Sequence, residues 1–448
     1  MEICREIGKG KKYHIRTYGC QMNERDSETL AGILADLGYT RTASVEEADL
    51  ILFNTCCVRE TAERKIYGRL NELRPLKKKR PDLLIGVGGC MAQKDKERVL
   101  TKAPHVDFVF GTHNIQELPE LISKAAALSE PLVQVWEEGQ VPLVDLPAQR
   151  EGKLKAYVTI TYGCTNFCTY CIVPYVRGKE RSRPPQDIIQ EVTELAQEGY
   201  KEVTLLGQNV NTYGRDLGKG VSFAQLLREV NQVEGIQRIR YTTSHPRDFT
   251  AEIIAAVRDC DKVCEHFHLP IQAGSNRILQ RMNRGYTREE YLQLVERIRE
   301  EVPDCSITTD IIVGFPGEEE EDFAATLDIV RQVRFDNAFT FVFSPRSGTP
   351  AAKMKEQVPE DVKKERLNRL MELQDRISRD INEELRGKEL EVLVEGTSKK
   401  EEKILTSRTR TNKLVLFPGE EDLMGELVTV RITRPQTWNL YGELVKIE

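Results

Sequence analysis

The sequence predicts an α/β protein in three parts: a doubly wound parallel sheet, an open barrel of strand–helix units, and a small barrel made only of strands. Two observations support this division. Short apolar runs alternate with helical patterns from residue 12 to about residue 127, and the alternation resumes with a longer period after residue 150. The end of the chain instead holds short β-rich runs that are separated by polar turns.

The first part, residues 11–128, is predicted to form an open parallel sheet with helices on both of its faces. Two stretches, Asn23–Leu37 and Val58–Leu76, have the apolar spacing of helices that pack on a sheet. Residues 129–149 contain scattered prolines and a Glu-Glu-Gly triplet, which predicts a linker. The expected strands are Tyr13–Tyr18, Asp49–Asn54, Leu83–Gly88 and Val106–Phe110.

The second part, residues 150–382, repeats strand and helix six times. Because eight such units are needed to close a full barrel, six units predict an open, partial barrel. A long amphipathic helix is expected near its end, from Pro359 to about Leu385. The six expected strands are Ala156–Thr161, Glu202–Leu206, Arg238–Thr242, His266–Pro270, Ser306–Val313 and Ala338–Phe343.

The third part, residues 383–448, is predicted to be all β. Five short strands in so short a stretch are typical of a small barrel of the oligonucleotide-binding sort. The expected strands are Glu389–Val394, Lys403–Thr406, Lys413–Phe417, Leu427–Ile432 and Leu440–Ile447.

Composition restricts the class of protein. The chain has 448 residues, of which 40% are hydrophobic and 30% charged, as in soluble proteins of more than one domain. It contains no apolar run of about 18 residues and no secretory pattern at its start, so we expect a cytoplasmic protein without a membrane segment. Its net charge of −6 means that contacts with nucleic acid would have to come from local basic patches. The candidate patches are Lys77–Arg80, Arg177–Arg183 and Arg408–Lys413.

Eleven cysteines in a chain without an export signal point to metal binding or catalysis rather than disulfides. Three of them, Cys164, Cys168 and Cys171, are separated by three and two residues and follow a predicted barrel strand, at the edge where barrel active sites form. A structural zinc ion needs four protein ligands, whereas three thiolates on a 4Fe-4S cluster leave one iron open to a substrate. The spacing therefore favours a catalytic cluster over a structural or zinc site.

A second set of cysteines, Cys20, Cys56 and Cys90, is dispersed in sequence. Each of them follows the end of a predicted strand of the first part, and these ends share one edge of a doubly wound sheet. Three thiolates should therefore converge on a second cluster; the alternative is that they are three buried core residues. Cys57 is a possible rival ligand, but Cys56 keeps the same offset from its strand end as the other two.

The other cysteines show no comparable grouping. Cys260 and Cys264, followed by His266 and His268, could suggest zinc, but we interpret this group as structural. The remaining cysteines are predicted to be packing residues: Cys4, Cys260, Cys264 and Cys305.

Polar and glycine residues follow the other predicted strands of the partial barrel. Their amide and backbone groups could hold the amino, carboxylate and ribose groups of a small cofactor, although each alone could be an ordinary turn or cap. The candidates for cofactor binding are Gly207, Gln208, Asn209, Ser244, Gln272, Gly314 and Gly317.

The cysteine loop, with Tyr170 before its last cysteine, resembles the signature of radical S-adenosylmethionine (SAM) enzymes. Together with the upstream cysteines and the terminal barrel, the whole chain is similar to the methylthiotransferase family. The stretches Thr17–Glu24, Leu206–Tyr213 and Arg408–Lys413 look like its MiaB-type branch, which acts on isopentenylated tRNA. The resemblance implies a flavodoxin-like N-terminal domain, a partial (βα)6 radical-SAM barrel and a C-terminal TRAM domain. It also adds Tyr170 to the candidates for cofactor binding.

The resemblance further implies an activity. The product would be 2-methylthio-N6-isopentenyladenosine beside the anticodon. Forming it replaces an unactivated C–H bond of adenine, so a cofactor must carry out this step. The cluster on Cys164, Cys168 and Cys171 would cleave SAM to a 5′-deoxyadenosyl radical, a second SAM would supply the methyl group, and the cluster on Cys20, Cys56 and Cys90 would supply or carry sulfur. The expected partners are tRNA, an electron donor such as flavodoxin or ferredoxin, and a sulfur-delivery protein, for a monomeric enzyme.

The terminal barrel is expected to add tRNA affinity through Arg408, Arg410 and Lys413. Three other functions remain open at this point. Two are methylthiotransferases, one acting on N6-threonylcarbamoyladenosine in tRNA and one on an aspartate of a ribosomal protein. The third is a non-catalytic Fe–S sensor that binds RNA.

Overall fold

The computed structural model describes residues 7–57, 60–128, 130–136, 146–150, 152–398, 401 and 403–447; Cys4 lies outside them. Contacts divide the chain into two compact units. The first comprises Met1–Gly152, Tyr162–Phe167 and Cys171–Arg183, and the second Lys153–Thr161, Cys168–Tyr170 and Pro184–Glu448. Among the described helices, none is both long enough and apolar enough to cross a membrane.

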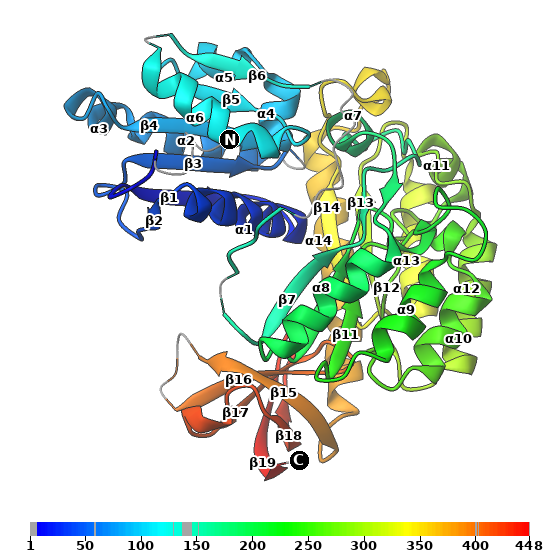
Figure 1. The fold of residues 1–448 in the computed structure, drawn as a ribbon. Coiled ribbons are helices and arrows are strands. Elements are labelled where there is room, and N and C mark those ends of the chain that lie inside the picture. Colours follow the sequence, from blue (N-terminus) through cyan, green and yellow to red (C-terminus); the bar gives the residue numbers. More distant parts are fainter. Residues whose placement is uncertain are drawn as a thin grey trace. The chain divides into compact units, whose positions relative to one another are not determined.

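The N-terminal part forms a six-stranded parallel sheet with strand order β2-β1-β3-β4-β5-β6 (Figure 1). Alternate residues of the central strand β3 face different cores: Ile51 and Phe53 pack in one, and Leu50 and Leu52 in the other. Because helices cover both faces, β3 is buried along its whole length. The strands are β1 (Lys12–Thr17), β2 (Thr40–Arg41), β3 (Leu50–Thr55), β4 (Leu84–Gly89), β5 (Phe108–Phe110) and β6 (Leu132–Gln134).

The predicted doubly wound sheet is confirmed. The sequence does not predict its two edge strands, because β2 has two residues and β6 lies in the segment expected to be a linker. The helices of this part are α1 (Gln21–Asp36), α2 (Glu60–Glu72), α3 (Arg74–Lys79), α4 (Cys90–Asp95), α5 (Arg98–Lys102) and α6 (Leu118–Ala127).

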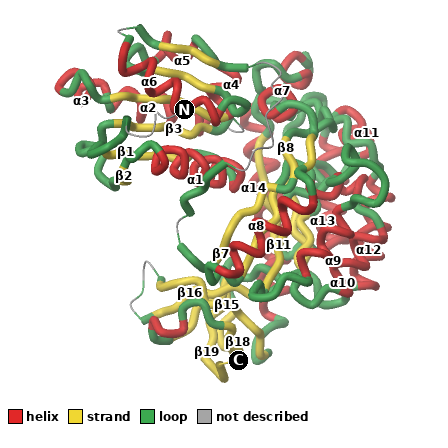
Figure 2. The backbone as a smooth tube through the Cα atoms, in the orientation of Figure 1, coloured by secondary structure: helices red, strands yellow, loops and turns green. Residues whose placement is uncertain are grey.

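The middle part contains six parallel strands in two groups of three, β11-β10-β7 and β12-β13-β14. A parallel bridge between Ile239 and Val263 joins the segments where the two groups meet. Figure 2 shows these strands in yellow among the red helices that follow them. The expected partial barrel of six strands is confirmed. The strands are β7 (Lys155–Thr159), β10 (Glu202–Leu206), β11 (Arg238–Tyr241), β12 (His266–His268), β13 (Ser306–Val313) and β14 (Asn337–Val342).

A short β8–β9 pair and eight helices complete this part. The long helix α14 presents a mixed buried face, because Arg366, Gln374 and Asn382 are buried beside Leu370 and Ile377. The elements are β8 (Thr161–Tyr162), β9 (Arg181–Ser182), α7 (Val173–Arg177), α8 (Pro185–Gln197), α9 (Phe223–Asn231), α10 (Ala251–Asp259), α11 (Asn276–Arg281), α12 (Arg288–Glu301), α13 (Glu320–Val333) and α14 (Glu360–Glu383).

The C-terminal part is a closed barrel with strand order β15-β16-β17-β19-β18, as expected. Closure removes the unpaired strand edges, and inward-facing apolar residues such as Val392, Val415 and Val430 fill its core. The strands are β15 (Glu389–Thr397), β16 (Ile404–Thr409), β17 (Leu414–Pro418), β18 (Leu427–Pro435) and β19 (Leu440–Ile447).

Candidate functional site

The dispersed cysteines Cys20, Cys56 and Cys90, hereafter the N-terminal triad, follow three neighbouring strands of the first sheet. Strand β3 pairs with β1 on one side and β4 on the other, so the carboxyl ends of all three lie together. Thr55 is opposite Gly89 in the register, which places Cys56 and Cys90 one residue beyond a matched pair. The structure thus brings these residues to one edge of the sheet, as the sequence predicts.

Two asparagines hold the backbone at this edge. Asn23 donates from Nδ2 to Asn54 Oδ1 at 3.2 Å, and Asn54 donates back to the Asn23 carbonyl at 2.7 Å. The Oδ1 atom of Asn23 lies 3.4 Å from the Cys20 amide and 3.6 Å from its Sγ. The pair therefore connects the segment that carries Cys20 to the end of β3. Neither asparagine could be identified from the sequence, because neither is a possible iron ligand.

Cys57 lies beside Cys90 and donates its thiol hydrogen bond to it. This bond, helped by the charge of Arg177 and opposed by burial, lowers the pKa of Cys90 to about 6. The same bond and burial raise the pKa of Cys57. Because iron binds the thiolate, the lowered pKa of Cys90 suits a ligand, whereas the raised pKa of Cys57 favours a neutral thiol.

Arg177 is the buried cation of this site. Its Nη2 lies 2.7 Å from Oδ2 of Asp26, and both side chains are nearly inaccessible to solvent. Burial opposes the charged form of Arg177, but the surrounding negative groups, with Asp26 first, raise its pKa further. Arg177 is the last residue of helix α7. Ile172, which caps the start of this helix, and Val176 within it pack in one core of the N-terminal sheet with Cys57 and Cys90.

The clustered cysteines lie in the loop between β8 and α7. Cys164 and Cys168 are buried, and Cys171 is half-buried. The loop begins at Gly163, which has a φ of +75° and where a Cβ would collide with the carbonyl of Lys179. The Cys164 amide then donates to the Gly178 carbonyl at 3.1 Å. Glycine is thus needed to begin the turn that carries the first cysteine.

Cys168 has a buried arginine as its neighbour. Arg284 places Nη1 3.3 Å from Cys168 Sγ and 3.3 Å from the hydroxyl of Tyr170. Its Nη2 donates to the Pro270 carbonyl at 2.8 Å, and its Nε donates to the Tyr286 hydroxyl at 3.1 Å. Arg284 could not be identified from the sequence, because nothing in its local pattern shows that it meets a cysteine 116 residues away.

Two predicted cofactor-binding residues, Ser244 and Gln272, are buried with an unsatisfied polar atom. Among the described residues, Ser244 Oγ, Gln272 Oε1 and both ring nitrogens of His245 have no hydrogen-bond partner. Gln272 also has a φ of +71° and Thr243 one of +70°, which are strained values outside glycine. Burial, followed by the charge of Arg284, lowers the pKa of His245 to about 2 and keeps the ring neutral. Such orphaned groups fit a small polar ligand such as SAM.

Other predicted cofactor-binding residues have structural partners instead. Asn209 donates to Asp248 Oδ2 at 3.1 Å and accepts from the His245 amide at 3.2 Å. Gly207 lies after β10 where a Cβ would collide with Thr161, and Gln208 is half-buried beside it. These contacts shape the loop, and the role of the three residues in cofactor binding stays a prediction.

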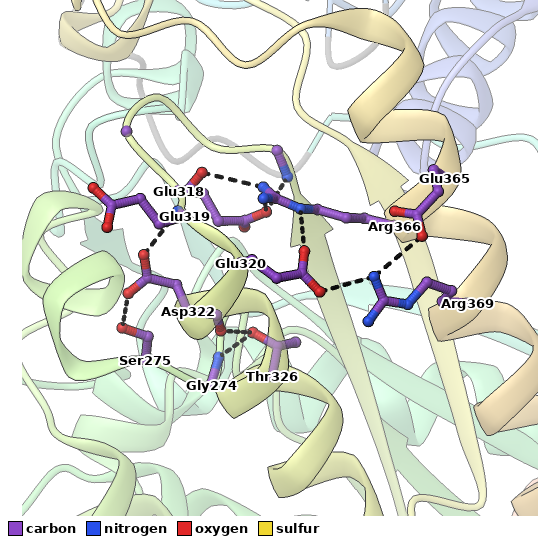
Figure 3. Close-up of polar contacts among 12 residues, drawn as sticks. Gly274, Ser275, Glu318, Glu319, Glu320, Asp322, Thr326, Glu365, Arg366 and Arg369 are labelled. Carbon is purple, nitrogen blue, oxygen red and sulfur yellow. Dashed lines mark hydrogen bonds and ion pairs between the residues drawn. The ribbon is translucent and has the colours of Figure 1, made fainter.

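Gly314 and Gly317 lie in the loop between β13 and α13. Ion pairs of Glu318 and Glu320 with helix α14 hold this loop in place (Figure 3). Glu318 accepts from the Gly314 amide at 2.8 Å and from Arg366 Nη1 of helix α14, also at 2.8 Å. Figure 3 also shows Glu320 between Arg366 and Arg369, with ion-pair distances of 3.5 and 2.8 Å. Gly314 has a φ of +71°, and a Cβ there would collide with the Lys363 side chain. Helix α14 thus fixes the loop that follows β13.

The histidines that could have suggested zinc share one threonine instead. His266 Nε2 and His268 Nδ1 each lie 3.0 Å from Thr308 Oγ1. Burial lowers the pKa of His266 well below its ordinary value. In the described part of the chain, no group of three His, Cys, Asp or Glu side chains is arranged to hold a single metal ion.

The basic residues of the terminal barrel form ion pairs within the chain, which the sequence does not predict; their contact with RNA stays a prediction. Arg410 forms an ion pair with Glu265 at 2.6 Å, and Lys413 forms one with Asp336 at 2.7 Å. Arg408 lies 3.2 Å from Glu395. Glu265 and Asp336 directly precede β12 and β14 of the partial barrel, so the ion pairs of Arg410 and Lys413 join the two barrels, whereas Glu395 lies on β15 of the terminal barrel. The sequence could not show this because the partners are distant along the chain.

Comparison with known families assigns all three parts. Residues 12–111 match the uncharacterized protein family UPF0004, residues 158–330 match the radical SAM superfamily, and residues 383–445 match the TRAM domain. Among solved structures, the radical SAM methyltransferase TsrM from Kitasatospora setae covers 76% of this chain and 74% of its own, with a TM-score of 0.54 and 14% identity. The cobalamin-dependent radical enzyme OxsB gives a TM-score of 0.51 at 11% identity, covering 82% of this chain and 56% of its own. At these identities the likeness concerns the fold alone.

Sequence relatives are much closer. The tRNA-2-methylthio-N(6)-dimethylallyladenosine synthase of Acetivibrio thermocellus is 58% identical, covering 98% of this chain and 92% of the relative. The protein of the same name from Moorella thermoacetica is 59% identical, covering 97% of this chain and 98% of the relative. This chain therefore belongs to the tRNA-2-methylthio-N(6)-dimethylallyladenosine synthase family of radical SAM proteins.

Proposed function

We propose that this protein converts N6-isopentenyladenosine beside the anticodon of tRNA to its 2-methylthio derivative. The observation that carries this proposal is the identity of 59% to a synthase of that name, over 97% of this chain and 98% of the relative. The match therefore extends over all three parts of this chain. A non-catalytic sensor would not need the buried, unsatisfied polar groups beside the second set.

The two cysteine sets are assigned different clusters. The enzyme uses two 4Fe-4S clusters and SAM. Cys164, Cys168 and Cys171 would hold the cluster that supplies, when SAM is bound, the electron for cleavage to a 5′-deoxyadenosyl radical. The N-terminal triad would hold the second cluster, which we assign to sulfur transfer. A second SAM would provide the methyl group.

The chain's own residues would bind and orient SAM. Ser244 Oγ and Gln272 Oε1 are unsatisfied in the described structure and are suited to hydrogen-bond the polar groups of the ligand. The loop of Gly314 and Gly317 would present backbone groups to the ligand, while Glu318 and Arg366 keep that loop in place. Tyr170 is held through Arg284, so it positions the cysteine loop rather than binding SAM by a free hydroxyl.

At the N-terminal triad, we retain Cys56 as the third ligand. Cys57 has a raised pKa and donates a hydrogen bond to Cys90, which suits a neighbour that stabilises the ligand thiolate. Asn23 would orient Cys20, and the ion pair of Arg177 and Asp26 would place a compensated positive charge beside the cluster.

We further infer a monomeric cytoplasmic enzyme that receives electrons from a flavodoxin or ferredoxin and sulfur from a delivery protein. The TRAM domain would contribute to tRNA binding. Since Arg408, Arg410 and Lys413 are paired internally, we expect other residues to contribute RNA contacts as well. Trp438 is a candidate because it is 60% exposed on the turn between β18 and β19, and aromatic rings stack on unpaired bases.

The test is mass spectrometry of tRNA nucleosides from a strain that lacks the gene. Restoring the gene should replace N6-isopentenyladenosine with its 2-methylthio form. A variant with alanine at Cys164, Cys168 and Cys171 should not restore it, whereas Cys305→Ala, outside both sets, should. Accumulation of 2-methylthio-N6-threonylcarbamoyladenosine instead would assign the chain to that branch, and an unchanged nucleoside profile would refute the proposal.

A further inference from the structure

Arg284 is a buried cation without an acidic partner. It is 4% exposed, and its guanidinium contacts two phenol hydroxyls, the Pro270 carbonyl and Cys168 Sγ. In the part of the chain that the structure describes, no carboxylate lies within ion-pair distance of it. A guanidinium stays charged in proteins, and an uncompensated buried charge is costly.

Other buried arginines of this chain show what is usual. Four of them form an ion pair with a carboxylate: Arg177 with Asp26, Arg238 with Glu391, Arg240 with Glu202 and Arg366 with Glu318. Arg284 differs because it contacts no carboxylate in the described structure. Of the groups that it contacts, the sulfur of Cys168, 3.3 Å from Nη1, is the one that would be an anion when it binds iron. The missing counter-charge would thus be provided by the Cys168 thiolate and what it binds.

We propose that Arg284 is a positioning residue that neutralises the cluster held by Cys164, Cys168 and Cys171 and makes it easier to reduce. The proposal rests on the function proposed above. Reduction adds one electron and so one negative charge, which a fixed cation nearby stabilises more than it stabilises the oxidised form. Hydrogen bonds to cluster sulfurs act in the same direction, and the Nη1–H donor points at a ligand sulfur.

The other contacts of Arg284 prevent it from turning away. Its Nη2 is bound to Pro270, and Tyr286, which accepts from its Nε, donates to the Ile271 carbonyl at 2.8 Å. These carbonyls directly precede Gln272, which has the unsatisfied Oε1. The same arginine therefore connects Cys168 with the segment that is proposed to bind SAM.

The experiment is an anaerobic potentiometric titration, followed by electron paramagnetic resonance, of the full-length chain. Alanine at Cys20, Cys56 and Cys90 leaves only the cluster of interest to be titrated. In that background, Arg284→Gln should keep four irons per chain and make one-electron reduction at least tenfold less favourable, a fall in midpoint potential of about 59 mV or more. Arg284→Lys retains the charge and should restore part of the difference. Arg240→Gln, which removes a buried arginine paired with Glu202, should leave the potential unchanged.

A potential in Arg284→Gln equal to that of the unaltered background would overturn the proposal, as would equal losses in Arg284→Gln and Arg284→Lys. If neither variant retains iron although circular dichroism shows the apoprotein folded, a role through charge is also refuted. Failure of the proposed function itself would look different: the triple variant at Cys164, Cys168 and Cys171 would still bind a SAM-responsive cluster.

Discussion

The buried ion pair between Glu318 and Arg366 allows a quantitative test of how the loop of Gly314 and Gly317 is held in place. The two side chains are 2% and 6% exposed, and their charged atoms lie 2.8 Å apart. Arg366→Met would leave Glu318 buried without its cation, which typically costs about 3–5 kcal/mol. Replacing both partners, as in Glu318→Gln with Arg366→Met, removes the uncompensated charge and should recover roughly half or more of that loss.

The pH dependence has a definite sign. Burial raises the pKa of Glu318 above its ordinary 4.5 even with Arg366 present, so the folded state holds its proton to higher pH than the unfolded state does. The stability from this proton is fully present below about pH 4.5 and is lost as pH rises through the folded pKa. Loss of Arg366 should raise that pKa further. The penalty of Arg366→Met should therefore be smaller at pH 5 than at pH 8.

The assay is urea unfolding of the full-length apoprotein at several pH values, with the free energy of unfolding compared at equal m-values. Binding of SAM to the reconstituted protein, measured by calorimetry, should weaken in Arg366→Met because the loop of Gly314 loosens. Arg369→Met provides a control, since its pairs with Glu320 and Glu365 are exposed and worth less than about 1 kcal/mol. A loss below 1 kcal/mol for Arg366→Met, or a double variant no more stable than the single one, would refute the reasoning.

Four further predictions can be tested by single substitutions. Cys56→Ala should halve the iron content of the reconstituted protein by chemical analysis, while Cys57→Ala should retain it; the reverse would exchange their roles. Gly314→Ala should destabilise the folded state by about 1–3 kcal/mol in urea, because φ is +71° and Lys363 blocks the space of a Cβ. Trp438→Ala should weaken tRNA binding in a gel-shift titration by about 1–3 kcal/mol if a base stacks on the ring. Arg410→Ala should instead lower thermal stability without changing the salt dependence of tRNA binding, and a smaller salt slope would restore it as an RNA contact.

The regular elements of the fold were predictable because their signals are local. Strands β10 (Glu202–Leu206) and β13 (Ser306–Val313) begin and end as the apolar runs indicate. Strand β6 was not predictable, since Leu132–Gln134 stands among prolines and is a strand only because β5 pairs with it. The domain boundaries at residues 128, 149 and 382 remain predictions.

The site divides in the same way. Six cysteines could be assigned from their spacing and from the shared edge of parallel strands, and their roles as ligands remain to be tested. The partners of those cysteines could not be assigned, because Arg284 meets Cys168 across 116 residues of chain. The ion pair of Arg410 could not be predicted for the same reason, because its carboxylate partner Glu265 is 145 residues away. A sequence shows which residues are charged, but not which of those charges the fold neutralises.

Helix α7 limits how this chain could be divided. Ile172, the residue after the last cysteine of the loop, and Val176 are part of a core on one face of the N-terminal sheet. Arg177, the next residue, is paired with Asp26 of the same part. A fragment beginning at residue 150 would expose both apolar side chains, each worth about 1.5–3 kcal/mol when buried, and would leave Arg177 without its acid. A fragment ending at residue 149 would lack the side chains of Ile172 and Val176 and so would have a cavity in its core. The apparent linker is therefore a poor place to split the gene, and two halves made separately should aggregate unless they are synthesised together.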